Sequence, residues 1–138
     1  MRFLLVLLTL LACACGPAHA CQGCTAPTVP VVTTAAPGFD VLITDTDRAV
    51  TVRLGQRIEL VLHARPGMSS WSGVNVDDST ILKAVPTGIT AARGVTIAGY
   101  AAVRPGTATI RATATPLCSP GQACPLFAML FEAQVTVT

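Results

Sequence analysis

Apolar and polar residues alternate with a period of two through much of the chain after Gly38. Residues 39–44, 49–54 and 58–62 each carry apolar side chains at every second position. This period is the pattern of a strand with one buried face, and two such runs on either side of Gly55-Gln56 indicate a hairpin. We therefore predict strands in all three segments and a hairpin between the second and the third.

Three further strands are expected in the second half of the chain. Residues 95–103 form one, in which Gly99 marks a bulge or a close approach of another segment. An Arg-Pro-Gly turn then leads into a strand over residues 107–114. The last and longest strand, residues 127–137, turns its apolar side chains to one side: Phe127, Met129, Phe131, Ala133, Val135 and Val137.

The sequence contains no convincing apolar stripe at the 3.6-residue spacing of a helix. Short strands separated by turns over roughly 100 residues are typical of a sandwich of two sheets. We therefore predict an all-β fold, a single Ig-like antiparallel β-sandwich of about seven strands, over residues 38–138.

The chain begins with the features of an export signal. Met1-Arg2 is followed by an apolar run from Phe3 to Ala12, which is too short to span a bilayer. Residues 1–20 therefore predict export, and we expect the mature protein outside the cytoplasm, secreted or lipid-anchored at a bacterial cell envelope.

Two kinds of processing fit this signal. Ala18-His19-Ala20 is a peptidase motif that would leave Cys21 at the mature N-terminus. The segments that end at Cys13 and at Cys15 resemble bacterial lipoboxes, in which one of these cysteines receives a lipid. The first route gives a secreted protein, and the second gives membrane association through the lipid alone. Residues 21–37, uncharged and rich in proline, threonine and alanine, are expected to be an extended linker.

Charge argues against a nucleic-acid partner. The formal net charge of +2 includes Arg2 of the signal, so the mature chain is nearly neutral. A nucleic-acid-binding surface needs clustered basic residues, which the sequence does not have. The remaining basic residues are scattered: Arg48, Arg53, Arg57, Arg65, Lys83, Arg93, Arg104 and Arg111.

A family resemblance rests on two segments. Residues 50–62, followed after a short loop by Trp71, are similar to the opening strands of the chagasin-type inhibitors of papain-like cysteine proteases. Residues 105–110, Pro-Gly-Thr-Ala-Thr-Ile, resemble a late strand of that family and of bacterial Ig-like modules in general. The resemblance covers residues 49–137 and implies an Ig-like sandwich whose inhibitory loops gather at one end.

The loops depart from that family's pattern. Residues 65–70 read Arg-Pro-Gly-Met-Ser-Ser where the family has Asn-Pro-Thr-Thr-Gly, and residues 116–125 replace its Arg-Pro-Trp. The glycine-rich second loop would map to residues 92–94. Trp71 is either a core residue, as in many Ig-like sandwiches, or an exposed anchor for a partner. The candidate partner-binding residues are Arg65, Pro66, Gly67, Met68 and Trp71.

The cysteines outside the lipoboxes form two pairs. Cys118 and Cys124 flank a Pro-Gly turn between two strands, and we predict that they form a disulfide. Cys21 and Cys24 form a C-x-x-C motif, for which a second disulfide is the simplest interpretation. A zinc site built from both pairs is the alternative. A haem attachment would need a histidine where the chain has Thr25.

Few side chains suit catalysis. His63 ends a predicted strand, where a solvated or capping imidazole is expected. Asp77 and Asp78 are neighbours in a turn, and Asp45 and Asp47 lack a third acidic residue for calcium. We therefore predict a protein that is not an enzyme, with no catalytic residues, no metal site and no cofactor.

Two function classes remain. The first is a non-catalytic binding module that recognises an extracytoplasmic protein or an envelope polymer through its loops, with papain-like proteases as one named target. The second is a structural envelope lipoprotein whose domain is a spacer without a dedicated ligand.

Overall fold

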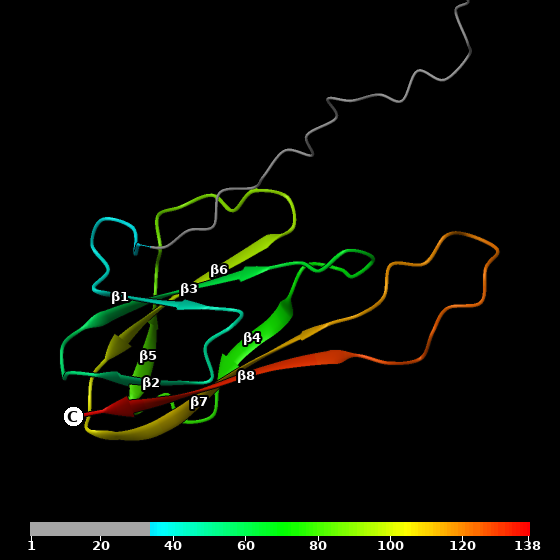
Figure 1. Cartoon of the computed structure of the whole chain (residues 1–138). Helices are drawn as coiled ribbons and strands as arrows, with labels where there is room; N and C mark the ends of the chain where they lie inside the picture. Colours follow the sequence, from blue (N-terminus) through cyan, green and yellow to red (C-terminus); the bar gives the residue numbers. More distant parts are fainter. Residues whose placement is uncertain (1–33) are drawn as a thin grey trace, which may run out of the picture. The chain divides into compact units, whose positions relative to one another are not determined.

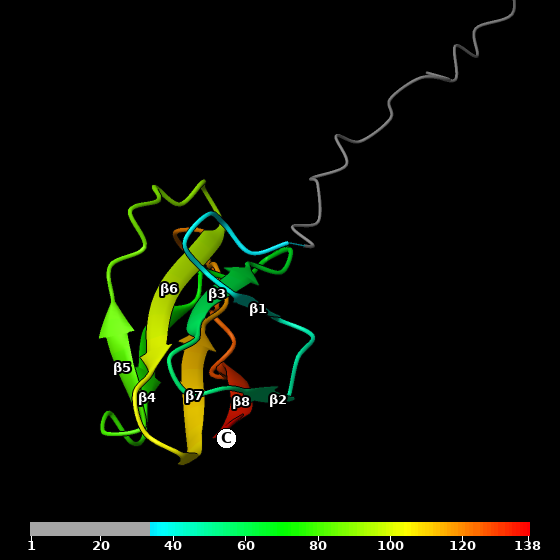
Figure 2. The same cartoon turned by 90° about the vertical axis from the view of Figure 1, so that its left-hand side faces the viewer.

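A computed structural model describes residues 34–138, which form two four-stranded sheets packed face to face (Figures 1 and 2). The prediction of an all-β sandwich is therefore confirmed. None of the residues from 34 onward forms a helix that could cross a membrane. The strands are β1 (Val41–Thr44), β2 (Ala49–Val52), β3 (Arg57–His63), β4 (Ser72–Val76), β5 (Leu82–Val85), β6 (Val95–Ala102), β7 (Gly106–Ala114) and β8 (Met129–Val137).

The sheets have one more strand than the seven expected, and they are mixed rather than purely antiparallel. Sheet A has the order β1-β3-β6-β5, and sheet B has the order β2-β8-β7-β4. The short edge strands β1 and β2 pair in parallel with β3 and β8, whereas the other pairs are antiparallel. Each sheet therefore gains a parallel edge strand from the first part of the described chain.

The hairpin predicted around Gly55 is wrong, because β2 belongs to sheet B and β3 to sheet A. Gly55 has a φ of 87°, and the turn carries the chain from one sheet to the other. Its flanks are fixed by different sheets: Leu54 N–H donates to the Thr138 carbonyl, and Gly55 N–H donates to the Ala102 carbonyl. Two strands that face each other across a core show the same alternation as two strands side by side, so the pattern could not separate these cases.

The core lies between the inner faces of the two sheets, as the alternation predicts. The inward side chains of β7, at positions 108, 110 and 112, are buried, as are those of β8 at positions 131, 133, 135 and 137. Phe127 differs from the prediction because β8 begins only at Met129, and its side chain is 54% exposed. The largest fully buried side chains are Phe131, Ile43, Ile58, Leu60, Leu62, Leu82, Ile110, Val52 and Val135.

The segment before β1 covers part of the outer face of sheet A. Ala36 N–H donates to Glu59 Oε2 at 2.6 Å, and this Glu59 side chain in β3 is buried. The Phe39 ring lies against Gly99, where an added Cβ would come within 3.1 Å of the ring and 2.7 Å of the Val85 carbonyl oxygen. Gly99 stays in register with both β3 and β5, so it marks a close approach and not a bulge. We call residues 34–40 the N-terminal strap.

Candidate functional site: the three-loop end

Three loops meet at one end of the sandwich because of the strand register. His63 at the end of β3 pairs with Val95 at the start of β6, and Ala114 at the end of β7 pairs with Met129 at the start of β8. The start of β4 lies beside the end of β7. The loops 64–71, 86–94 and 115–128 therefore share this end, which we call the three-loop end (Figure 1).

Backbone hydrogen bonds join the loops to one another. Ala64 N–H donates to the Gly94 carbonyl at 2.7 Å, which ties the first loop to the second. Ser69 N–H donates to the Thr115 carbonyl and Leu117 N–H to the Gly67 carbonyl, both at 2.8 Å, which tie the first loop to the third. The three-loop end is therefore one connected surface rather than three independent loops.

The predicted contact residues of the first loop divide into two groups. Arg65, Pro66 and Gly67 are exposed, whereas Met68 and Trp71 are only 9% and 6% exposed. The interpretation of Met68 and Trp71 as an exposed contact pair is corrected accordingly, and the alternative of a core tryptophan describes the structure.

Trp71 can be buried because its ring packs against another side chain and its indole N–H has a hydrogen-bond acceptor inside the protein. The indole Nε1–H donates to the His63 carbonyl at 2.9 Å, and the ring meets Phe131 edge-on with 6.1 Å between centroids. The Thr96 hydroxyl donates to the Trp71 carbonyl at 2.8 Å. Trp71 thus supports the three-loop end from beneath and is not available to a partner.

The most exposed large apolar side chains of the three-loop end are in the third loop instead. Leu117 is 67% exposed, Phe127 is 54% exposed and Leu126 is completely exposed. No charged residue occurs between Arg111 and Glu132, so the whole loop is uncharged. Sequence reasoning did not select these three residues, although the long uncharged run between two strands was a signal that could have done so.

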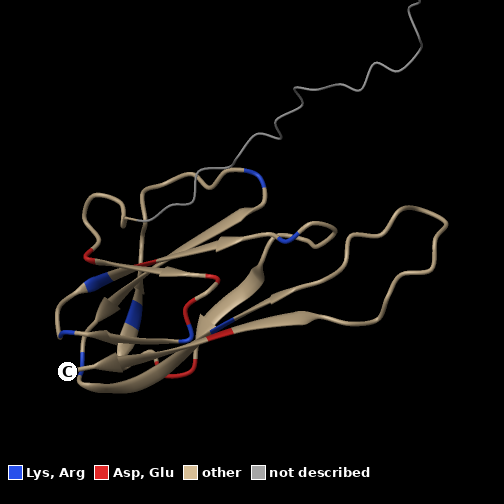
Figure 3. Ribbon diagram, in the orientation of Figure 1, with Lys and Arg blue, Asp and Glu red and all other residues tan. Residues whose placement is uncertain are grey.

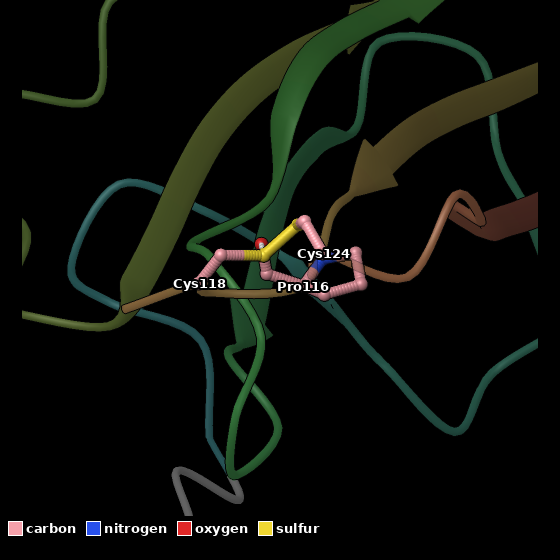
Figure 4. Close-up of a disulfide and its surroundings, with 3 residues drawn as sticks. All are labelled: Pro116, Cys118 and Cys124. Carbon is pink, nitrogen blue, oxygen red and sulfur yellow. Dashed lines mark hydrogen bonds between the residues drawn. A yellow bond between two sulfur atoms is a disulfide. The ribbon is translucent and has the colours of Figure 1, made fainter. Parts of the chain in front are cut away.

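A disulfide closes the third loop. Cys118 and Cys124 are bonded through their Sγ atoms, with 5.6 Å between their Cα atoms, and both are exposed (Figure 4). The bond draws together the segments that carry Leu117 and Leu126. Closing a loop of this length stabilises the folded state by about 2 kcal/mol on the chain-entropy account. The disulfide also restricts the positions that the side chains of Leu117 and Leu126 can take.

The aspartates considered for catalysis or calcium binding serve turns. Asp77 Oδ1 accepts the Thr109 N–H at 2.7 Å, and Asp78 Oδ1 accepts the N–H and the hydroxyl of Thr80 at 2.8 and 2.6 Å. Asp47 Oδ2 accepts the N–H of Thr44 at 2.7 Å. Among residues 34–138, no three His, Cys, Asp or Glu side chains gather closely enough to hold a metal ion.

These hydrogen bonds lower the pKa of two carboxyls. The Thr109 backbone N–H is the main cause that holds the pKa of Asp77 below its ordinary value, and Arg111 adds to it. The Thr80 hydroxyl and N–H do the same for the pKa of Asp78. A lowered pKa in an exposed turn indicates a structural carboxylate, not a proton donor at neutral pH.

His63 lies at the end of β3, as predicted, with its Nδ1 3.9 Å from Asp45 Oδ1. Both side chains are about one-third exposed, and the His63 carbonyl is the acceptor of the Trp71 indole. The pair joins the β1–β2 connection to β3.

Several predicted features lie outside the described residues. They are the export signal over residues 1–20, the lipidation candidates Cys13 and Cys15, and the C-x-x-C pair Cys21 and Cys24. The structure therefore does not test the second disulfide, whereas the Cys118–Cys124 disulfide argues against the zinc site built from both pairs.

Comparison with known proteins gives a likeness of fold. No protein-family model matches the chain. No curated protein matches it either. Among solved structures, the chain is similar to the cysteine protease inhibitor EhICP2 from Entamoeba histolytica, with a TM-score of 0.50 and 17% identity over 75% of this chain and 100% of that chain. Amebosin also matches, with a TM-score of 0.42 and 21% identity over 73% of this chain and 100% of that chain. The likeness to EhICP2 confirms, at the level of the fold, the resemblance inferred from the sequence.

The Asp77 hydrogen bond predicts a loss of stability in acid. Because the folded state lowers the pKa of Asp77, its contribution is present above the unfolded pKa of about 3.9 and is lost as the pH falls through the folded value. We expect Asp77→Asn to make the free energy of unfolding fall less steeply below about pH 4, measured by urea denaturation at several pH values. Ser79→Ala in the same turn should keep the wild-type slope, and an equally steep fall in Asp77→Asn would contradict the assignment.

The burial of Trp71 predicts a large effect on stability. Trp71→Phe removes the indole donor from the His63 carbonyl and leaves a void beside Phe131, so the free energy of unfolding should fall by about 2 kcal/mol. Denaturant titration measures this change, and the fluorescence of this sole tryptophan should be shielded from acrylamide in the wild type. Leu117→Ala, at an exposed position, should change stability by less than about 0.5 kcal/mol. Equal effects of the two variants would place Trp71 outside the core.

Proposed function

We propose that this protein is a non-catalytic, extracytoplasmic binding module that uses its three-loop end to recognise another protein, with a papain-like cysteine protease as the target to test first. The observation that carries the proposal is the exposure of Leu117, Leu126 and Phe127 on one disulfide-closed loop. Exposed apolar side chains that gather on a folded surface are typical of interaction sites.

The loop is suited to enter a concave partner. In Figure 1 residues 115–128 extend beyond the ends of β7 and β8, away from the two sheets. The loop is fixed at its base by the Leu117–Gly67 hydrogen bond and within itself by the disulfide. A segment that is already restrained loses less conformational entropy on binding, which favours affinity.

Two findings support a protease as the first target. The fold is similar to that of a solved cysteine protease inhibitor, and the three loops share one end, as the sequence resemblance implies. The loop sequences of that family are replaced here, so the contacts would be made by the apolar side chains of residues 117–127. An inhibitor of this kind acts by occupying the cleft and needs no catalytic group of its own.

One observation favours the spacer function instead. Trp71 is buried, so it cannot serve as the tryptophan anchor that is common in protein interfaces. The loops of a pure spacer are expected to be polar, however, and the third loop is apolar and uncharged. The apolar third loop outweighs the burial of Trp71, because exposed leucine and phenylalanine side chains lower solubility unless a partner covers them.

An inhibition assay against papain tests the proposal. The purified chain should inhibit papain reversibly, and Leu117→Ser with Phe127→Ser should weaken inhibition about tenfold or more, because both side chains would lose apolar burial in the cleft. Leu54→Ser with Val103→Ser is the matched control, since both residues are about half exposed and lie in turns at the opposite end. Absence of inhibition at high micromolar concentration would rule out papain-like proteases as the target. An equal loss of inhibition in the control variant would rule out the three-loop end as the binding surface.

The extracytoplasmic location has a separate test. When the full chain is expressed in a bacterial host, its intact mass should show removal of the signal. Cleavage after Ala20 without an added acyl mass indicates a secreted protein, and a lipid-bearing Cys13 or Cys15 indicates an anchored one. An unprocessed chain that stays in the cytoplasm would contradict export.

A further inference from the structure

The three-loop end carries positive charge only. Arg65 in the first loop and Arg93 in the second are the only charged residues of the loops 64–71, 86–94 and 115–128. Figure 3 shows blue but no red in the loops at this end of the sandwich. The carboxylates of the described residues lie outside the three loops, although Asp45 is 3.9 Å from His63 at the end of β3: Asp40, Asp45, Asp47, Glu59, Asp77, Asp78 and Glu132.

The two arginines start from neighbouring backbone positions. The Ala64–Gly94 hydrogen bond of 2.7 Å joins the residue before Arg65 to the residue after Arg93. Both side chains are exposed, and neither forms an ion pair with any of residues 34–138. Among the described residues no carboxylate neutralises either guanidinium, so an incoming carboxylate would find both available for binding.

Most other arginines of the described chain already have partners. Arg104 lies 3.6 Å from Asp78, and Arg111 lies 2.7 Å from Glu132 and 3.7 Å from Asp77. Arg48 and Arg57 lie over aromatic rings, those of Phe131 and Phe39. Arg53 and Lys83 also form no ion pair with the described residues, but both lie outside the three loops.

The arginines are connected to the apolar loop. Gly67, two residues after Arg65, accepts the N–H of Leu117 at 2.8 Å. The two arginines and the exposed apolar side chains therefore lie on loops that backbone hydrogen bonds join to one another. A partner that fits these loops needs an apolar centre and carboxylates on one side.

We propose that the three-loop end recognises a protein site in which apolar side chains are bordered by carboxylates, and that Arg65 and Arg93 bind these carboxylates while Leu117 and Phe127 enter the apolar part. This proposal rests on the binding function proposed above and specifies the chemistry of the partner. Arginine binds carboxylates with two parallel hydrogen bonds, which adds direction to the attraction. Exposed interfacial charges act mainly on the association rate, and their effect weakens with salt.

A displayed library of random constrained peptides, selected on the immobilised full chain, tests the partner chemistry without assuming any one natural partner. The enriched peptides should combine apolar residues with Asp or Glu. Their affinity should fall about tenfold or more for Arg65→Glu with Arg93→Glu at low salt, with a smaller fall at high salt. The matched control is Arg53→Glu with Lys83→Glu, which makes the same change of net charge at two exposed residues outside the three loops.

The outcomes separate this proposal from the protease function. Two results would overturn the carboxylate proposal. One is a set of enriched peptides without an excess of acidic residues. The other is that the enriched peptides bind the variant with Arg65→Glu and Arg93→Glu as tightly as they bind the control variant. Inhibition of papain that is unaffected by the charge reversal would overturn it while leaving the protease function intact. Selection of acidic, apolar peptides that bind through the arginines, by a chain that does not inhibit papain, would support the carboxylate proposal and reject the protease.

Discussion

The pairing of β7 with β8 is the interaction on which both the core and the three-loop end depend. These strands stay in register from Gly106 and Val137 to Ala114 and Met129, the longest antiparallel pair among the described residues. Their inward side chains, Ile110 and Phe131 among them, form much of sheet B's share of the core. The same register brings residues 115 and 128 close together, so the loop between them must project from the sandwich. The register of β7 with β8 therefore determines both the packing of sheet B against the core and the position of the third loop.

The alternation of apolar residues predicted the strands in which apolar side chains recur at every second position. β7 was predicted to within one residue and β8 to within two, because each shows this pattern over nine positions. β4 and β5 were not located, because β4 has no buried residue and an irregular register, and β5 buries only Leu82. The pairing of β2 with β3 failed for a different reason: alternation reports which face is buried and carries no information about the strand on either side.

The candidate site was predicted in position but not in composition. The register placed the first and third loops at one end, as the sequence resemblance implied. The exposed leucine and phenylalanine side chains are in the third loop, whereas the candidates from the sequence were in the first loop, where Arg65, Pro66 and Gly67 are exposed and Met68 and Trp71 are buried. Exposure of a large apolar residue depends on what the rest of the fold places over it. Trp71 is covered because Phe131 comes from β8, and a local pattern cannot show a contact across sixty residues of chain.

The N-terminal strap has a mechanical consequence. β3 runs toward the three-loop end, and β1 lies parallel to it, so the described chain enters its first strand far from the loops. A pull on Thr34 while a partner holds the loops would run along the strand axes. Such tension loads the hydrogen bonds between β1 and β3 in shear, all at once, together with the Ala36–Glu59 bond of the strap. Breaking these hydrogen bonds together takes more force than breaking them one after another.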